Sequence, residues 1–193
     1  MNETERCFIA LTISSAAQKR LGEVQRLLQT AGVRVRWEPE EKLHVTVRFL
    51  GTTSQEQKKY LSDALLAFST SITPFDLVFH FVGVFPDMRH PRVLWAGALL
   101  TEGISNVWKS VESLARSSGY PADTKAIHPH STLARIRAKD DVASLTGVIN
   151  SITFDPVLTR ASEIVLMKSV LLQGGSQYTR LATFPFKRHR SDP

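Results

Sequence analysis

Two short segments of this sequence place a histidine two residues before a threonine: His44-Val45-Thr46 and His130-Ser131-Thr132. Imidazole has an ordinary pKa near 6.5, so at neutral pH it can either give or accept a proton. A hydroxyl beside it can donate a hydrogen bond to an anionic oxygen. Two such pairs brought together would supply an acid, a base and two donors, which suits acid–base catalysis on an anionic substrate.

Each pair lies in a segment that is predicted to be a β-strand, and the first of them, LHVTVRFLG, alternates apolar and polar residues almost perfectly. We expect Leu43, Val45, Val47 and Phe49 to share one face, and His44, Thr46 and Arg48 to share the other. Positions i and i+2 of a strand point the same way, so each threonine lies beside its histidine. The pairs are 130 − 44 = 86 residues apart, a little under half the chain, which indicates a duplication. One His-x-Thr is a common accident in a chain with six histidines, whereas two copies, each on a strand that precedes a helix, favour a function.

The rest of the chain predicts an α+β fold with mostly antiparallel pairing, because short turns join several strands. A run of Phe75, Leu77, Phe79 and Phe81 is expected on one face of its strand, with His80 as a packed strand histidine. Ser54 and Gln57 form a capping-box pattern. The predicted strands are 6–13, 33–37, 43–50, 74–85, 92–99, 130–136, 162–172 and 177–186, and the predicted helices are 15–30, 55–68, 102–118 and 141–150.

Composition allows one soluble domain or two small lobes that share a core: 193 residues, 42% hydrophobic and 22% charged. We predict a single domain over 1–186 and a basic, solvated tail over 187–193. The net charge of +6 favours a polyanionic partner such as RNA or DNA. No segment is long and apolar enough to span a membrane, and the N-terminus has no secretory pattern. The single cysteine, Cys7, excludes an internal disulfide and fits the cytosol.

The paired motifs resemble those of the 2H phosphoesterase superfamily, and the intervening segments resemble the bacterial and archaeal RNA 2′,3′-cyclic phosphodiesterases, also called 2′-5′ RNA ligases. The similarity extends nearly from end to end. It is carried by CFIALTI, EKLHVTVRFLG, VFPDMRHPRVLWAG, HPHSTLAR, EIVLMKS and YTRLATFPF. Ser131 departs from the pattern, where an apolar residue is usual, and should face away from the groove.

This resemblance implies a two-lobed fold with two pseudo-symmetric sheets, flanking helices and a central groove. It implies hydrolysis of RNA 2′,3′-cyclic phosphate ends to 2′-phosphates, with His44 as general acid and His130 as general base. The sequence itself does not distinguish the two roles. Thr46 and Thr132 would donate to the phosphate oxygens.

Three further residues are expected to bind substrate. Arg135 fits the family pattern as a phosphate ligand, although strict alternation places it opposite His130 unless a bulge or the strand's end re-aims it. Arg48 shares the parity of His44 and is expected farther along the groove. Trp37, or Phe8, could stack a nucleobase, with core packing as the alternative, and for Phe8 the favoured one.

No cofactor or metal is expected. His128 and His130 are too few ligands for a metal site, and no glycine-rich loop of the Walker type is present. The expected partner is an RNA or oligonucleotide end that carries the cyclic phosphate, bound by a cytoplasmic monomer. Two alternatives stay open: ATP-independent joining of cyclic-phosphate and 5′-hydroxyl ends, and an RNA-end binding module without turnover.

Overall fold

The computed structural model describes residues 4–137, 140, 145–173 and 175–187. Within them the strands are β1 (Glu5–Thr12), β2 (Arg36–Trp37), β3 (His44–Thr53), β4 (Phe75–Phe85), β5 (Val93–Ala98), β6 (His130–Arg135), β7 (Val157–Ala161), β8 (Glu163–Leu172) and β9 (Gly175–Pro185). The helices are α1 (Ser15–Thr30), the 3-10 helix η1 (Glu40–Lys42), α2 (Gln55–Ser69), α3 (Glu102–Ser117) and α4 (Leu145–Ser151). No helix in this part of the chain is both long and apolar enough to cross a membrane.

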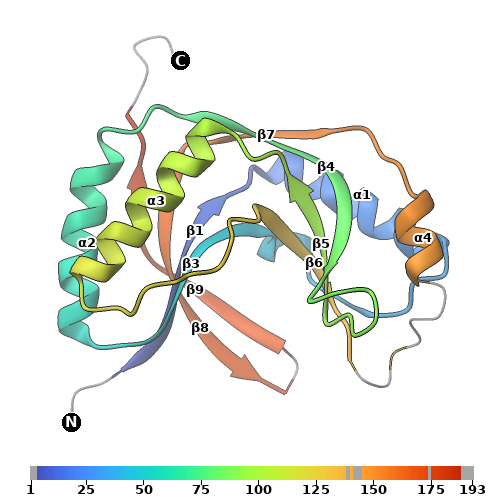
Figure 1. Cartoon of the computed structure of the whole chain (residues 1–193), viewed down its shortest axis with the longest axis horizontal. Coiled ribbons are helices and arrows are strands. Elements are labelled where there is room, and N and C mark those ends of the chain that lie inside the picture. The colour runs from blue at the N-terminus through green and yellow to red at the C-terminus, as the bar shows by residue number, and fades with distance from the viewer. Residues whose placement is uncertain (1–3, 138–139, 141–144, 174, 188–193) are drawn as a thin grey trace.

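The described strands form one curled antiparallel sheet in the order β7-β4-β5-β6-β3-β1-β8-β9, with β2 added beside β6 (Figure 1). The centre of this order is the β6–β3 pair, which is joined through the single register pair Val45↔Ser131. The half of the sheet formed by β7, β4, β5 and β6 contains β4 from the first half of the chain, which pairs with β5. The half formed by β3, β1, β8 and β9 contains β8 from the second half of the chain, which pairs with β1. This α+β architecture is the predicted one, with the two expected sheets continuous at their shared centre.

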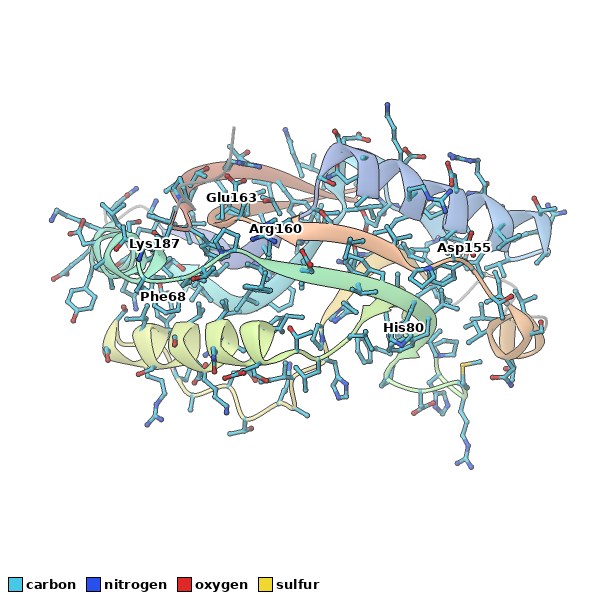
Figure 2. All side chains as sticks on the ribbon, turned by 90° about the horizontal axis from the view of Figure 1, so that it is seen from above. Phe68, His80, Asp155, Arg160, Glu163 and Lys187 are labelled. Atoms are coloured by element: carbon cyan, nitrogen blue, oxygen red, sulfur yellow. The ribbon has the colours of Figure 1, made fainter. Side chains whose placement is uncertain are left out.

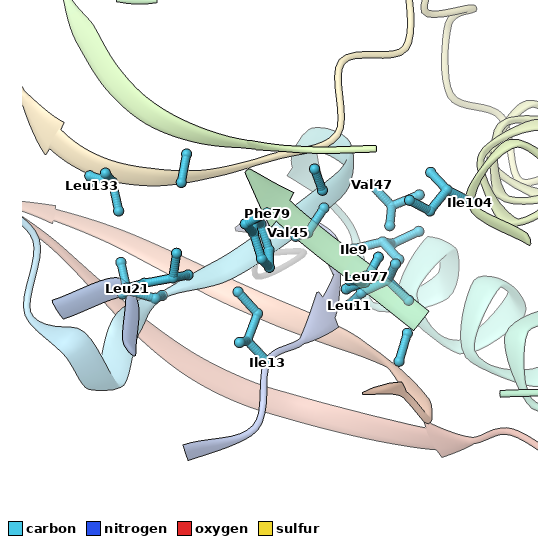
Figure 3. Packing of buried hydrophobic residues seen from close by; sticks show 14 of the residues in the cluster. Ile9, Leu11, Ile13, Leu21, Val45, Val47, Leu77, Phe79, Ile104 and Leu133 are labelled. Atoms are coloured by element: carbon cyan, nitrogen blue, oxygen red, sulfur yellow. The ribbon is translucent and has the colours of Figure 1, made fainter. Parts of the chain in front are cut away.

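The main core lies on one face of the sheet, beneath the helices. Ile9 and Leu11 of β1, Val45 of β3 and Phe79 of β4 are completely buried there, and helix residues such as Leu21 pack on them (Figure 3). α2 and α3 pack together, and α1 packs along β7 (Figure 1). Because the core covers this face of the sheet, the opposite face of the central strands remains available for a functional site.

Local signals place the helix starts as expected. Ser14 caps α1 by accepting a hydrogen bond from the Ala17 amide, and Ser54 with Gln57 forms the complete capping box of α2. The segment 33–37 contributes only the two residues of β2, and β7 was not predicted at all. α4 begins at Leu145, and residues 141–144 of the helix predicted there lie outside the described residues, as do 188–193 of the predicted tail.

Two aromatic positions on β4 differ from the alternating pattern because the strand contains a bulge. The register moves from Phe79↔Ala98 to Phe81↔Gly97, so His80 is an extra residue with no partner on β5. Phe81 consequently leaves the core face and is 42% exposed. His80 is exposed too, on the outside of β4, and not packed as predicted (Figure 2).

Candidate active site

The two His-x-Thr pairs lie on neighbouring strands and on the same face of the sheet. Val45 of β3 pairs with Ser131 of β6, and both are completely buried on the core face. The flanking residues therefore point to the opposite face, which we call the histidine face. Antiparallel register then sets His44 opposite Thr132 and Thr46 opposite His130, so that the histidines are diagonal neighbours at roughly 7–8 Å. Ser131 faces away from the site, as expected.

Each histidine is held by the same backbone contact. His44 Nδ1 lies 2.6 Å from the carbonyl oxygen of Lys42, and His130 Nδ1 lies 2.6 Å from that of His128. A carbonyl only accepts, so Nδ1 carries the proton that is donated. In the neutral ring Nε2 is then left as a free proton acceptor. His44 Nε2 lies 3.2 Å from the Thr46 hydroxyl, which shows that it is directed along the histidine face.

Aromatic rings pack against both imidazoles. His44 contacts Phe8 and Tyr178, with ring centroids 5.1 and 5.3 Å apart. His130 contacts Phe85 and Trp95, at 4.9 and 5.9 Å. Phe8 is almost completely buried, so it packs under His44 instead of stacking a base. Tyr178, Phe85 and Trp95 were not predicted at the site, because aromatic residues in strands are most often core residues.

A β-bulge at Leu133 returns Arg135 to the histidine face. The β5–β6 register moves from Trp95↔Thr132 to Leu94↔Ala134, which leaves Leu133 as the extra residue. Position 135 therefore regains the parity of His130 and Thr132. Two donors fix the bulge at the Leu133 carbonyl, which accepts from the Glu38 amide at 2.9 Å and from Nε2 of buried Gln25 at 2.8 Å.

Glu38 orients Arg135 on this face. The Arg135 Nε donates to Glu38 Oε1 at 3.1 Å, and the Arg135 side chain is 44% exposed. Within the described residues its two terminal nitrogens have no bonded partner, so they are available to an anion. This geometry is the one that a phosphate ligand needs, because one edge of the guanidinium is anchored and the other is free.

Arg48 lies on the core face, contrary to the predicted parity. The β1–β3 register moves from Ala10↔Thr46 to Ile9↔Arg48, so Val47 is a bulge residue and Arg48 shares the face of Ile9. Its Nε lies 2.8 Å from Glu112 Oε2 of α3, an ion-pair contact whose angle is too bent for a hydrogen bond. Its terminal nitrogens contact Asp123 and the carbonyls of Phe49 and Pro121. Arg48 thus joins α3 and the following loop to β3 and is not placed to bind substrate.

The bulge at Val47 also turns the side chain of Phe49 to the opposite face of the sheet. Phe49 was predicted on the core face. Phe49 pairs with Phe8, is 64% exposed and lies on the histidine face, with ring centroids 6.0 Å apart. Bulges three residues after each histidine make Phe49 and Arg135 equivalent positions in the two halves. No signal in the sequence marks Phe49 as a site residue.

Trp37 also lies away from the site. It pairs with Ala134, which is buried in the main core, and its own side chain packs against that core. Its neighbours Arg36 and Glu38 point to the histidine face instead. The predicted base-stacking role of Trp37 therefore has no support from its position.

Comparison with known proteins identifies the family. A family model described as LigT-like phosphoesterase matches residues 11–95. The RNA 2′,3′-cyclic phosphodiesterase of Aquifex aeolicus is 30% identical over 183 residues, which cover 92% of this chain and 93% of that protein. The chain belongs to this phosphodiesterase family. The protein of the same name from Methanothermobacter thermautotrophicus is 26% identical over 182 residues, covering 93% and 97% of the two chains.

Solved structures agree on the fold. Apo LigT of E. coli aligns with a TM-score of 0.75 at 23% identity, covering 96% of this chain and 99% of that one. A protein from Thermus thermophilus aligns with a TM-score of 0.77 at 24% identity, covering 95% and 100%. The comparisons confirm both the family that the motifs resemble and the fold that this resemblance implies.

A cavity of about 280 Å³ lies beside His44 in this phosphodiesterase. Apolar side chains from β1, β8 and β9 line it together with charged residues: Ala10, Val165, Met167 and Tyr178 are joined by Glu41, Lys42 and Arg180. An apolar lining with a few polar groups is typical of small-molecule sites. Beside His130, by contrast, the rings of Phe81 and Phe85 pack against Trp95. The two sides of the site therefore differ, and the cavity lies on the His44 side.

Burial lowers the pKa of both histidines below the ordinary 6.5. For His44, burial is partly offset by the Lys42 carbonyl and by Glu38, while His130 and Arg135 lower its pKa further. For His130, burial is again the largest cause of the lowered pKa. The hydrogen bond to the His128 carbonyl raises the pKa, and the charge of the His128 ring lowers it. Both rings are therefore largely neutral at neutral pH in the free enzyme.

This electrostatic setting predicts an acidic optimum for kcat/KM. If the two histidines act as acid and base, one ring must be neutral and the other protonated, so kcat/KM should peak between the two lowered pKa values, below about pH 6.5. Above that peak the protonated acid is lost, and kcat/KM should fall about tenfold per pH unit. A pH profile of kcat/KM on a cyclic-phosphate substrate measures this. A maximum above pH 7 would show that the free-enzyme pKa values are not lowered.

Proposed function

We propose that this enzyme hydrolyses RNA 2′,3′-cyclic phosphate ends to 2′-phosphomonoesters by metal-independent acid–base catalysis. One observation carries the proposal: two histidines on neighbouring strands lie on the same face of the sheet, and each is fixed through Nδ1 so that Nε2 is left to exchange a proton. An in-line displacement at phosphorus needs a base and an acid on opposite sides of the phosphate. Diagonal positions on two strands supply that arrangement without any other group.

In the proposed reaction His130 Nε2 takes a proton from water as the water oxygen bonds to phosphorus. The bond from phosphorus to the ribose 3′ oxygen breaks, and the protonated His44 gives its Nε2 proton to that oxygen. The phosphate stays on the 2′ oxygen. Hydroxyls of Thr46 and Thr132, together with the free edge of Arg135, would stabilise the charge that grows on the non-bridging oxygens.

The cavity beside His44 supports this orientation of the substrate. If the nucleoside occupies it, the ribose lies on the His44 side of the phosphate, so His44 and not His130 faces the departing ribose oxygen. That this oxygen is the 3′ one is what the family resemblance implies. Trp37 and Arg48, which were predicted to bind substrate, do not line this cavity. Its aromatic side chain, Tyr178, and the exposed Phe49 are the rings that we assign to the base and sugar.

One experiment tests both parts of the proposal. An oligonucleotide with a 2′,3′-cyclic phosphate end is incubated with the enzyme in EDTA, and the product is treated with a 3′-phosphate-specific phosphatase. Turnover should persist, because no three His, Cys, Asp or Glu side chains of the described residues gather as a metal site requires. The product should resist the phosphatase. Loss of turnover that a divalent ion restores contradicts the mechanism, and quantitative phosphate release contradicts the orientation.

We also propose that the active unit is a cytoplasmic monomer whose residues 1–186 form one domain. A single chain supplies both histidines and both threonines, so no second copy is needed to complete the site. Lys187, where the predicted tail begins, still bonds to the fold through its amide and the Ile72 carbonyl, at 2.8 Å. The buried, unpaired thiol of Cys7 fits a reducing compartment.

A further inference from the structure

Arg36 lies directly beside Arg135 and has no anionic partner within the described residues. The two arginines are a register pair of β2 and β6, so both point to the histidine face. Glu38, two residues after Arg36, bonds to Arg135 and not to Arg36 within the described residues. Like charges opposite one another in a sheet repel, and nothing in the described fold offsets the charge of Arg36. The Arg36–Arg135 pair therefore carries one positive charge that no carboxylate of the described residues neutralises.

The position of Arg36 extends the site in a defined direction. Arg135 lies three residues beyond Thr132 on β6, about 10 Å along the strand, and Thr132 is opposite His44. Arg36 lies beside Arg135 on the edge of β6 that also pairs with β3, and its guanidinium lies against the backbone of Gly175 at the start of β9. Lys42 contacts the same turn, since its Nζ donates to the Ser176 carbonyl at 3.2 Å. Positive groups therefore continue from His44 toward the β8–β9 hairpin.

We propose that Arg36 binds the internucleotide phosphate that precedes the cyclic phosphate, so that the enzyme prefers an oligonucleotide end to a mononucleotide. The inference rests on the proposed function, because it assumes that the cyclic phosphate lies between His44 and His130. A nucleoside 2′,3′-cyclic phosphate has one phosphate, which the histidines and threonines engage. Only a chain with a 5′-phosphate on its last nucleotide brings a second anion, and a planar guanidinium fits such a phosphate.

Three substrates separate the second phosphate from the second nucleoside. They are adenosine 2′,3′-cyclic phosphate, its 5′-phosphorylated form, and the dinucleotide ApA with a 2′,3′-cyclic phosphate end. The quantity compared is kcat/KM for the dinucleotide divided by kcat/KM for the unphosphorylated nucleotide. Arg36→Ala should lower this ratio about tenfold, as expected for the loss of one hydrogen bond to a charged group. The 5′-phosphorylated nucleotide should show the same loss. Arg36→Lys keeps the charge and should recover part of the ratio.

Arg116→Ala is the matched control, because Arg116 is exposed near the end of α3 and has no part in the site. It should leave the ratio unchanged. For the dinucleotide, the dependence of log kcat/KM on log salt should become shallower by about 0.7 in Arg36→Ala, which is the loss of one phosphate contact. Thermal melting checks that the variants are folded.

Two results would overturn the inference while the proposed function stands. In one, the wild-type enzyme hydrolyses all three substrates and the ratio in Arg36→Ala stays at the wild-type value. In the other, folded Arg36→Ala loses equally on all three, which assigns Arg36 a structural role. If the folded wild-type enzyme hydrolyses none of the three substrates, the proposed function itself fails, and the inference fails with it.

Discussion

Replacing His130 by alanine should lower kcat by about 10²- to 10⁴-fold, the usual worth of a general acid or base. His44→Ala should cost a similar factor. Each ring is fixed through Nδ1 on a backbone carbonyl of its own strand, so neither can move to take over the proton transfer of the other. Because both act on one step, the double variant should be little worse than either single one. Steady-state hydrolysis of an oligonucleotide with a cyclic-phosphate end measures all three.

The matched control for these variants is His90→Ala. His90 lies in the loop between β4 and β5 with its side chain 77% exposed, and its nearest charged contact is Asp87 at 3.9 Å. Removing it deletes an imidazole without touching the histidine face, so kcat should stay at the wild-type value. Near-wild-type turnover by folded His130→Ala would place the catalytic centre elsewhere. Thermal melting of each variant separates loss of chemistry from loss of fold.

Arg135→Ala should lower kcat/KM by about a hundredfold. Fixed donors to the oxygens that gain charge in the transition state are worth about 10² to 10³ each, and Arg135 offers the free edge of its guanidinium. Arg135→Lys should restore only part of the loss, because an ammonium group cannot bond to Glu38 through one edge and to phosphate through the other. Glu38→Gln should cost less than Arg135→Ala, since the cation is kept and only its anchor is weakened.

Arg137→Ala serves as the charge-matched control. Arg137 lies two residues farther along, with its side chain 51% exposed, and pairs with Asp140 at 3.0 Å. If removal of Arg137 were as costly as removal of Arg135, the effect would reflect overall charge and not a phosphate contact. The salt dependence of kcat/KM distinguishes the two as well, because a general charge effect is screened with distance.

The placement of the proposed reaction centre on one face of the sheet could be predicted from the sequence because it depends on local periodicity. His44 and Thr46, like His130 and Thr132, are two apart on a strand, and that spacing sets both side chains on one face. The capping box at Ser54 is equally local, since its two hydrogen bonds join residues three apart. The buried position of Ser131 follows from the same alternation.

Residues just beyond each motif could not be assigned in this way, because β-bulges reverse the alternation. The bulge at Val47 moves Arg48 to the core face and Phe49 to the histidine face. The bulge at Leu133 does the reverse for Arg135, and so brings it to the site. A period of two predicts side-chain direction only while every residue has one partner on the next strand.

The bulge at Leu133 depends on partners that are distant in sequence. Its carbonyl accepts from the Gln25 side chain, 108 residues away, and from the Glu38 amide. The same contacts hold β2 against β6 and thereby place Arg36 next to Arg135. The sequence by itself determined the two histidines and their threonines, since strand geometry is a property of neighbouring residues. The arginines that surround them were decided only by the tertiary structure, because a bulge forms where distant backbone and side-chain groups satisfy the hydrogen bonds that the regular ladder gives up.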